Sequence, residues 1–137
     1  MRMDKLQRFL AKQEQVKLTY LFGSCAKGNQ GPLSDVDVAI FLDKRLSKKE
    51  RQKLKLELIN VVSSILKTNK LDLVVINDSP VDLNYEIIKH GKILQIRDVG
   101  EKTDIESGIL SHYLDRRYDE QRSLSIFLDR IIERRGS

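Results

Sequence analysis

The sequence predicts a single α/β domain in which a small mixed sheet is flanked by helices and followed by a helical tail. Three observations support this fold class. Segments with strand patterns alternate with segments of helical spacing, as in α/β folds. The 137 residues suit one domain, and no repeat or low-complexity linker divides them. We therefore expect one domain over residues 1–137, with a core over about 1–97 and a helical tail over about 103–134.

The first half of the chain supplies a helix and two strands. Apolar residues at helical spacing predict a helix over residues 3–10. Residues 16–22 and 36–42, rich in β-branched and aromatic residues, predict strands on either side of a loop at 23–34. The second strand is apolar on both faces except at Asp37, which is typical of a central, buried strand.

The second half continues the alternation. Ser47 and Glu50 form a capping box that starts a long helix. Its apolar stripe consists of Leu54, Leu58, Val61, Val62, Ile65 and Leu66. Residues 71–76 read as a third strand. Ser79 is predicted to cap a further helix that ends near Gly91, with Pro80 in its first turn.

The C-terminal part is predicted as an edge strand and a tail. The short apolar segment 93–96 suits an edge strand. Thr103 and Glu106 form a second capping box, which predicts a helical tail running to about residue 132. The polar stretch 115–123 suggests a bend or break in that tail. An apolar stripe follows, which either closes the core or packs on a partner: Leu124, Phe127, Leu128, Ile131 and Ile132.

Composition narrows the classes of protein. The net charge of +5 favours anionic partners, although the basic segment 44–57 reads most simply as a solvated helix face. The single cysteine, Cys25, excludes an internal disulfide and a multi-cysteine zinc site. No secretory leader pattern or long apolar run is present, so we expect a cytoplasmic location. The isolated His90 and His112 read as ordinary helix residues.

Residues 21–43, LFGSCAKGNQGPLSDVDVAIFLD, contain the most informative pattern. Gly23 and Ser24 end a strand, where glycine permits a tight turn and the following amides are able to converge on a phosphate. Lys27 adds a positive charge in the loop, and Ser34 is placed to bind a carboxylate or cap the turn. This loop is therefore a candidate nucleotide-phosphate site.

Three aspartates provide the acidic part of this pattern. Asp35 and Asp37 lie two residues apart on one strand, so both side chains project from the same face. Carboxylates this close repel each other unless a cation lies between them, and Mg²⁺ prefers such oxygen ligands together with substrate phosphates. Asp72 begins a neighbouring strand among apolar residues, where a lone charge would be costly. Sharing a metal with the first pair would remove that cost.

Together these residues predict a two-metal site for nucleotidyl transfer, with Asp35, Asp37 and Asp72 as metal ligands and catalytic groups. Asp72 is also a candidate acceptor for the proton of the attacking hydroxyl. Asp43 follows the same strand but reads as a turn residue. Each motif has a structural explanation on its own, whereas the order Gly-Ser, Asp-x-Asp and a later strand Asp is hard to produce by accident.

At these residues the sequence resembles the DNA polymerase β-like nucleotidyltransferase superfamily, and its small size and GS-x-A-K-G…SD-x-D pattern resemble the minimal nucleotidyltransferases, or MNT proteins. The segment NYEIIKHGKIL is similar to the family's segment after the third acid. Cys25 and Lys27 stand where many relatives have arginine. The resemblance implies nucleotide binding by Gly23 and Ser24.

The MNT resemblance also implies a reaction and a partner. MNT proteins act as antitoxins of HEPN-domain ribonucleases, so the expected reaction is Mg²⁺-dependent transfer of AMP from ATP to a tyrosine of such a toxin. Two alternatives remain open from the residues. One is an inactive antitoxin that neutralises its partner by binding alone; the other is AMP transfer to a small hydroxyl compound, which the short chain disfavours. A homo- or hetero-oligomer fits either role, and no membrane or direct nucleic-acid partner is expected.

Overall fold

The computed structural model describes residues 3–23 and 36–136, and their arrangement is the predicted α/β fold. A four-stranded mixed sheet has the order β3-β2-β1-β4. Its strands are β1 (Val16–Phe22), β2 (Val36–Leu42), β3 (Leu71–Val75) and β4 (Lys92–Ile96). β1 pairs antiparallel with β2 and β4, while β2 and β3 run parallel. The predicted edge strand near the end of the domain is confirmed as β4.

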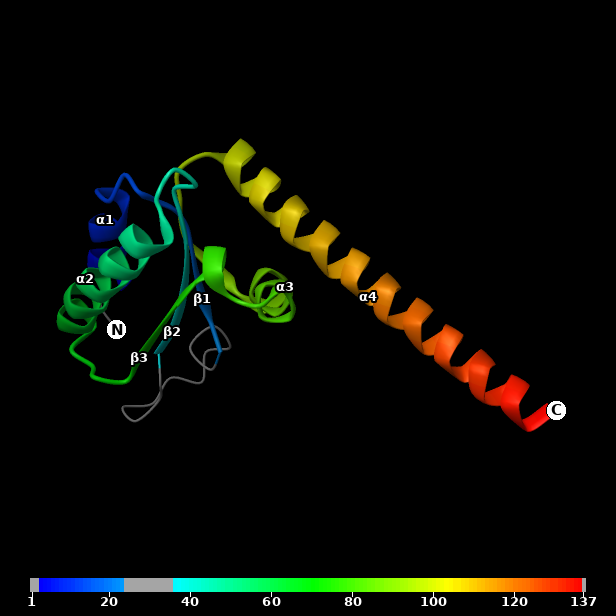
Figure 1. Ribbon diagram of the computed structural model, residues 1–137. Helices are drawn as coiled ribbons and strands as arrows, with labels where there is room; N and C mark the ends of the chain where they lie inside the picture. Colours follow the sequence, from blue (N-terminus) through cyan, green and yellow to red (C-terminus); the bar gives the residue numbers. More distant parts are fainter. Residues whose placement is uncertain (1–2, 24–35, 137) are drawn as a thin grey trace.

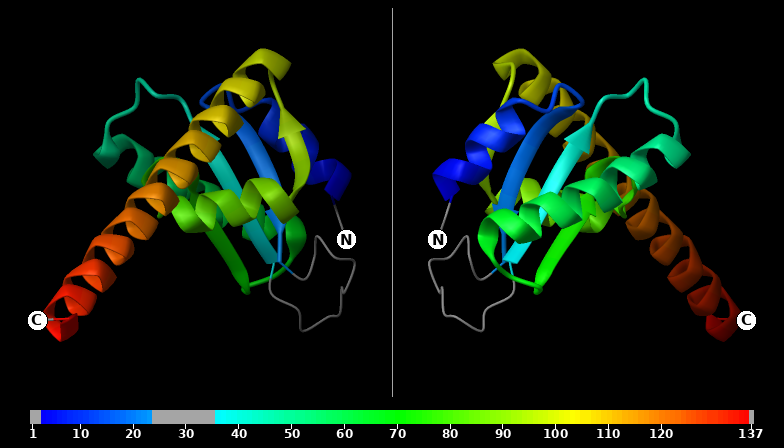
Figure 2. Two further views of the ribbon diagram at one scale, coloured as in Figure 1. Left: turned by 90° about the vertical axis from the view of Figure 1, so that its right-hand side faces the viewer. Right: turned by 90° about the vertical axis from the view of Figure 1, so that its left-hand side faces the viewer.

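Two helices cover each face of this sheet (Figures 1 and 2). On one face lie α1 (Met3–Ala11) and α2 (Lys48–Leu66); on the other lie α3 (Val81–His90) and the first turns of α4 (Val99–Gly136). A short 3₁₀ helix, Ile76–Asp78, follows β3. The α2 helix starts at the predicted capping box, in which the Ser47 hydroxyl accepts from the Glu50 amide and the Glu50 carboxylate accepts from the Ser47 amide.

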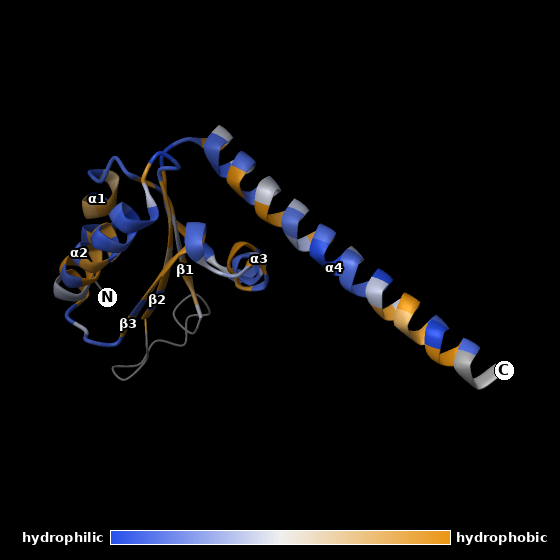
Figure 3. Cartoon of the chain, viewed as in Figure 1, coloured by the Kyte–Doolittle hydropathy of each residue, from blue (hydrophilic) through white to orange (hydrophobic). Residues whose placement is uncertain are grey.

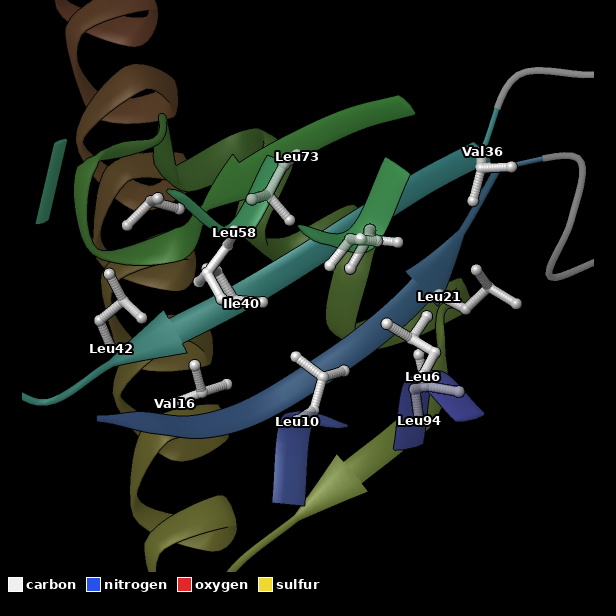
Figure 4. Close-up of a cluster of buried hydrophobic side chains, with 13 residues drawn as sticks. Leu6, Leu10, Val16, Leu21, Val36, Ile40, Leu42, Leu58, Leu73 and Leu94 are labelled. Atoms are coloured by element: carbon white, nitrogen blue, oxygen red, sulfur yellow. The ribbon is translucent and has the colours of Figure 1, made fainter. Parts of the chain in front are cut away.

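The larger part of the core lies between the sheet and the α1–α2 layer (Figure 4). Leu6 and Leu10 of α1 and Leu58 of α2 meet the alternating residues of β2 that point to this side. The residues of β2 on this face are Val36, Val38, Ile40 and Leu42. Because side chains alternate along a strand, Asp37, Ala39 and Phe41 face the opposite layer. Asp37 thereby lies on the side of α3 and α4.

Three predicted helix features are corrected by the structure. The helix after β3 begins at Val81 with Pro80 as its cap residue, while the Ser79 hydroxyl bonds the Ile76 carbonyl and Asn84. The last helix begins at Val99, not at Thr103: Asp98 accepts hydrogen bonds from the amides of Gly100 and Glu101. Pro80 thus takes the cap position predicted for Ser79, and the Asp98 carboxylate takes the capping role predicted for Thr103.

The third correction concerns the tail. No break occurs over residues 115–123, because α4 is one helix of 38 residues from Val99 to Gly136. Its polar stretch is all exposed and keeps its helical hydrogen bonds without any apolar face to bury. Beyond the stacked rings of Tyr85 and Tyr113, 3.8 Å apart, α4 projects away from the domain (Figure 1).

The base of α4 is joined to the sheet by a polar cluster. The hydroxyl of Tyr20 on β1 donates to the Glu106 carboxylate at 2.5 Å, and Lys102 pairs with the same carboxylate at 2.5 Å. Burial, reinforced by Glu106, raises the pKa of Tyr20 far above its ordinary value. Ile105 and Ile109 pack beside this cluster against the sheet. No helix among residues 3–23 and 36–136 has the length and apolar character needed to cross a bilayer.

Candidate functional site

Asp37 and Asp72 lie side by side on neighbouring strands. In the parallel pairing of β2 with β3, the Cα atoms of these two residues are partners in the register. Their side chains therefore project from the same face, the one that carries Ala39 and Val74 against α3 and α4. The predicted approach of the third strand aspartate to the Asp-x-Asp segment is confirmed for Asp37.

The surroundings of Asp72 differ from the prediction. Its side chain is exposed, because β3 is the edge strand of the sheet and Asp72 is near the beginning of that strand. No burial cost therefore needs to be offset at Asp72. Asp37, on the central strand next to it, is half-buried. The adjacent carboxylates form an electronegative position open to solvent on one side.

Several predicted site residues lie outside the described part of the chain. These residues are Ser24, Lys27, Ser34 and Asp35, and Cys25 is among the same segment. Gly23 and Val36 bound this segment, so it joins the end of β1 to the beginning of β2 beside Asp37.

Position 23 requires glycine, because the carboxylate of Asp37 lies against it. Its φ is +73°, a left-handed conformation that favours glycine. A Cβ atom added to Gly23 would stand 2.2 Å from Oδ2 of Asp37, a distance that real Cβ atoms do not adopt. Phe22, the residue before it, is the register partner of Asp37 across the β1–β2 ladder. The sequence therefore needs glycine here for two reasons, a positive φ and room for a carboxylate.

Replacing Gly23 with alanine should displace the Asp37 carboxylate. We expect the strained φ and the clash to lower the free energy of unfolding by about 1–3 kcal/mol. We also expect any reaction that uses the Asp37 carboxylate to slow by about 100-fold, since misplacement of a reacting group by about 1 Å has that effect. Urea unfolding and a rate assay would measure the two effects. The Gly108→Ala variant is the control, because a Cβ there meets nothing within 4 Å; equal activity of both variants would contradict the role of Gly23.

A shallow hollow lies beside Gly23, between the end of β1 and α3. Its walls are Phe22, Leu83 and Ile87, and its rim carries Glu86 and His90, with Gly23 at one side. Nε2 of His90 lies 3.4 Å from the Glu86 carboxylate. Sequence reasoning assigned His90 only to a helix, which is correct, but missed its position next to the candidate site. The only signal was the Asn84–Leu94 resemblance, which gave no role to single residues.

Asp43 lies at the opposite end of β2 and does not join the site. Its carboxylate binds Arg45 at 2.8 Å and lies 3.8 Å from Nζ of Lys17. The hydrogen bonds from Arg45 hold the pKa of Asp43 well below its ordinary value. A hollow near this cluster also contains Phe41, Glu101 and Asp104, but it is separated from Asp37 by the length of the strand. The interpretation of Asp43 as a turn residue is confirmed.

The chemistry of the described residues fits Mg²⁺. Carboxylate oxygens on adjacent strands are hard ligands, and Mg²⁺ is commonly held by one or two of them together with phosphate oxygens and water. Within the described ranges no group of three His, Cys, Asp or Glu side chains is assembled around a possible metal position. Asp37 and Asp72 thus supply two of the three predicted carboxylates, and the third, Asp35, is not described.

Comparison with known proteins gives one family match. A family model described as polymerase beta nucleotidyltransferase matches residues 4–99. This range includes every strand and the three aspartates. No curated protein matches the chain.

Several solved structures share the fold. A chain in a crystal structure of a toxin–antitoxin with AMP-PNP has a TM-score of 0.73 at 22% identity, covering 93% of this chain and 99% of that chain. A chain in a MntA–HepT toxin–antitoxin structure has a TM-score of 0.66 at 20% identity, with 93% and 97% covered. A chain in a complex of tri-AMPylated HEPN toxin with MNT antitoxin from Shewanella oneidensis has a TM-score of 0.64 at 21% identity, with 93% and 96% covered.

Proposed function

Because this chain belongs to the polymerase beta nucleotidyltransferase family, we propose that it transfers AMP from ATP to a tyrosine of a HEPN-type toxin and thereby acts as its antitoxin. The observation that carries the proposal is the pairing of Asp37 with Asp72 on adjacent parallel strands. Two carboxylates held in this way, with a glycine turn fitted against one of them, suit metal-assisted phosphoryl chemistry better than a purely structural role.

The site residues have distinct roles in this proposal. Asp35, Asp37 and Asp72 would hold Mg²⁺, while Gly23 and Ser24, with Lys27 and Ser34, would bind the nucleotide phosphates. When bound, Mg²⁺ would neutralise phosphate charge and favour departure of pyrophosphate. Gly23 contributes by leaving the Asp37 carboxylate in place.

The proposed reaction is an in-line displacement. A tyrosine hydroxyl oxygen of the partner forms a bond to the α-phosphorus of ATP, and the bond from that phosphorus to the bridging oxygen of the β-phosphate breaks. Pyrophosphate leaves with the electron pair, and the tyrosine proton passes to a base. Asp72 is suited to accept this proton, because its carboxylate is exposed beside Asp37.

The choice of partner is supported by the solved complexes that share this fold. One of them holds an ATP analogue, and another contains an AMPylated HEPN toxin. Coverage of 93% of 137 residues corresponds to about 127 residues, so the match must include most of α4. The long helix is therefore part of the architecture that this chain shares with those proteins, not an addition to it.

The end of α4 is the proposed toxin-binding surface. Leu124, Phe127 and Leu128 are 57%, 58% and 47% exposed, and Ile132 continues the apolar group. Figure 3 shows this concentration of apolar residues near the C-terminal end of a helix that is otherwise mostly polar. None of these side chains belongs to either buried cluster of the described residues, which argues against the alternative that they close the core. Exposed apolar clusters of this kind are typical of protein-binding sites.

The direct test is to mix the protein with ATP, Mg²⁺ and a candidate HEPN-domain toxin, and to measure the intact mass of both proteins. We expect the toxin to gain whole AMP units and to lose its ribonuclease activity. A matched reaction with EDTA should show neither change, because the phosphate charge would no longer be neutralised. If the toxin is inhibited without a mass change in either protein, the alternative of neutralisation by binding alone replaces the proposal.

A further inference from the structure

We propose that the hollow between the end of β1 and α3 binds the nucleoside part of the ATP substrate. The hollow consists of Phe22, Gly23, Leu83, Glu86, Ile87 and His90. This inference rests on the proposed transferase function and assigns a ligand to residues that the predicted motifs do not include. Three features of the hollow support it: Gly23, which lines the hollow and also lies against the Asp37 carboxylate, the apolar lining, and the acidic side chain of Glu86.

Gly23 belongs to both the hollow and the carboxylate site. Its Cα faces Oδ2 of Asp37 so closely that a methyl group would not fit, and it also lines the hollow beside Phe22. In a nucleotide the ribose is joined directly to the α-phosphate. A substrate whose α-phosphate lies near Asp37 must therefore place its nucleoside within a few ångströms of that position. The hollow lined by Gly23 begins at that position.

The walls have the chemistry of a base-binding pocket. Phe22 and Leu83 pack at the boundary of the core, and Ile87 behind them is 1% exposed. The half-buried Phe22 and Leu83 form an apolar floor, and they pack against the buried cluster that contains Ile87, Tyr20 and Leu18. Small-molecule sites commonly combine such apolar walls with a few polar groups that fix orientation. A planar purine gains favourable burial against this floor, whereas a phosphate does not.

The rim determines which end of the nucleotide enters the hollow. Glu86 is an exposed carboxylate that repels phosphate but accepts hydrogen bonds from the amino group of a base or the hydroxyls of ribose. Nε2 of His90, at the end of α3, lies 3.4 Å from that carboxylate. Both residues lie one helical turn apart, so α3 presents them on the same side. The acid therefore favours the uncharged nucleoside over the triphosphate at this position.

The test compares the binding of ATP with the binding of inorganic tripolyphosphate to the full chain, both with Mg²⁺, by calorimetry. Tripolyphosphate reports on the phosphate site alone. Leu83→Trp fills the hollow, and we expect it to raise the Kd for ATP by about 10-fold or more. Glu86→Gln should raise the Kd for ATP by about 3–10-fold through loss of a charged hydrogen-bond acceptor. Neither variant should weaken the binding of tripolyphosphate. Glu86→Gln should strengthen that binding, because a repulsive charge is removed.

Leu56→Trp and Glu57→Gln are the matched controls, since both residues lie on the exposed surface of α2. Both controls should bind the two ligands like the unmodified protein. If ATP and tripolyphosphate bind but the hollow variants leave the Kd for ATP unchanged, or weaken both ligands equally, the nucleoside assignment is wrong and the transferase proposal stands. If neither ligand binds the unmodified protein, the transferase proposal itself fails. Glu86→Gln keeps the test decisive should Leu83→Trp not fold, because Glu86 is on the surface.

Discussion

Replacing Asp37 with asparagine is expected to lower the rate of AMP transfer to the toxin by about 10³-fold, which corresponds to about 4 kcal/mol of transition-state stabilisation. Asparagine has nearly the same shape as aspartate but lacks the negative charge that holds Mg²⁺ beside the phosphates. The free energy of unfolding should stay within about 1 kcal/mol of the original value, because the change also removes repulsion between Asp37 and Asp72.

The rate would be followed by intact mass of the toxin over time, and stability by urea unfolding. Asp72→Asn should cause a loss of similar size if Asp72 completes the carboxylate set. Asp4→Asn, at an exposed position of α1, controls for the loss of one acidic residue and should transfer AMP normally. Full activity of Asp37→Asn would refute the carboxylate site, whereas full activity of Asp72→Asn alone would restrict the site to Asp35 and Asp37.

The second large effect concerns the apolar end of α4. Changing Leu124, Phe127 and Leu128 together to glutamine should weaken the complex with the toxin by about 100-fold or more, since buried interface anchors each contribute about 2 kcal/mol or more. Glutamine is a good helix former, so α4 should persist. AMP transfer should fall as well, because the toxin would no longer be held near Asp37.

Complex formation would be measured by size-exclusion chromatography with light scattering, and helix content by circular dichroism. A triple change of the exposed Leu56, Leu110 and Leu114 to glutamine is the control, because it removes as many exposed apolar groups elsewhere. An unchanged toxin complex would show that the α4 end is not the toxin surface. If the triple variant instead loses only self-association, the surface belongs to a second copy of the chain.

Much of the sheet could be predicted from the sequence because its signals are local. β-Branched and apolar runs predicted each strand, and the single acid at Asp37 in an otherwise apolar β2 indicated a position where charge is needed. The alternation of strands and helices predicted a mixed sheet. Register could not be predicted in the same way, because the pairing of Asp37 with Asp72 depends on contacts across 35 positions of sequence.

The errors share a cause. The helix starts at Ser79 and Thr103 were predicted from hydroxyl residues, but Pro80 and Asp98 occupy the cap positions because tertiary packing sets where each helix can begin. The break over residues 115–123 was predicted from polarity, although a helix with no face to bury has no reason to break where its backbone bonds remain intact. Glu86 and His90 were missed because residues 22–23 and 83–90 meet only in the fold.

The contacts of Tyr20 with Glu106 and of Glu106 with Lys102 have a mechanical consequence. From Tyr113, whose ring stacks on Tyr85 of α3, to Gly136 the helix is about 35 Å long, at 1.5 Å per residue. A tilt of about 10° at its base would move its free end by about 6 Å over this length, more than a tyrosine could be misplaced and still react. These polar contacts, together with the stack of Tyr113 on Tyr85, therefore set the direction in which the apolar end of α4 projects. A toxin bound at the free end would be positioned relative to Asp37 by contacts at the base of the helix.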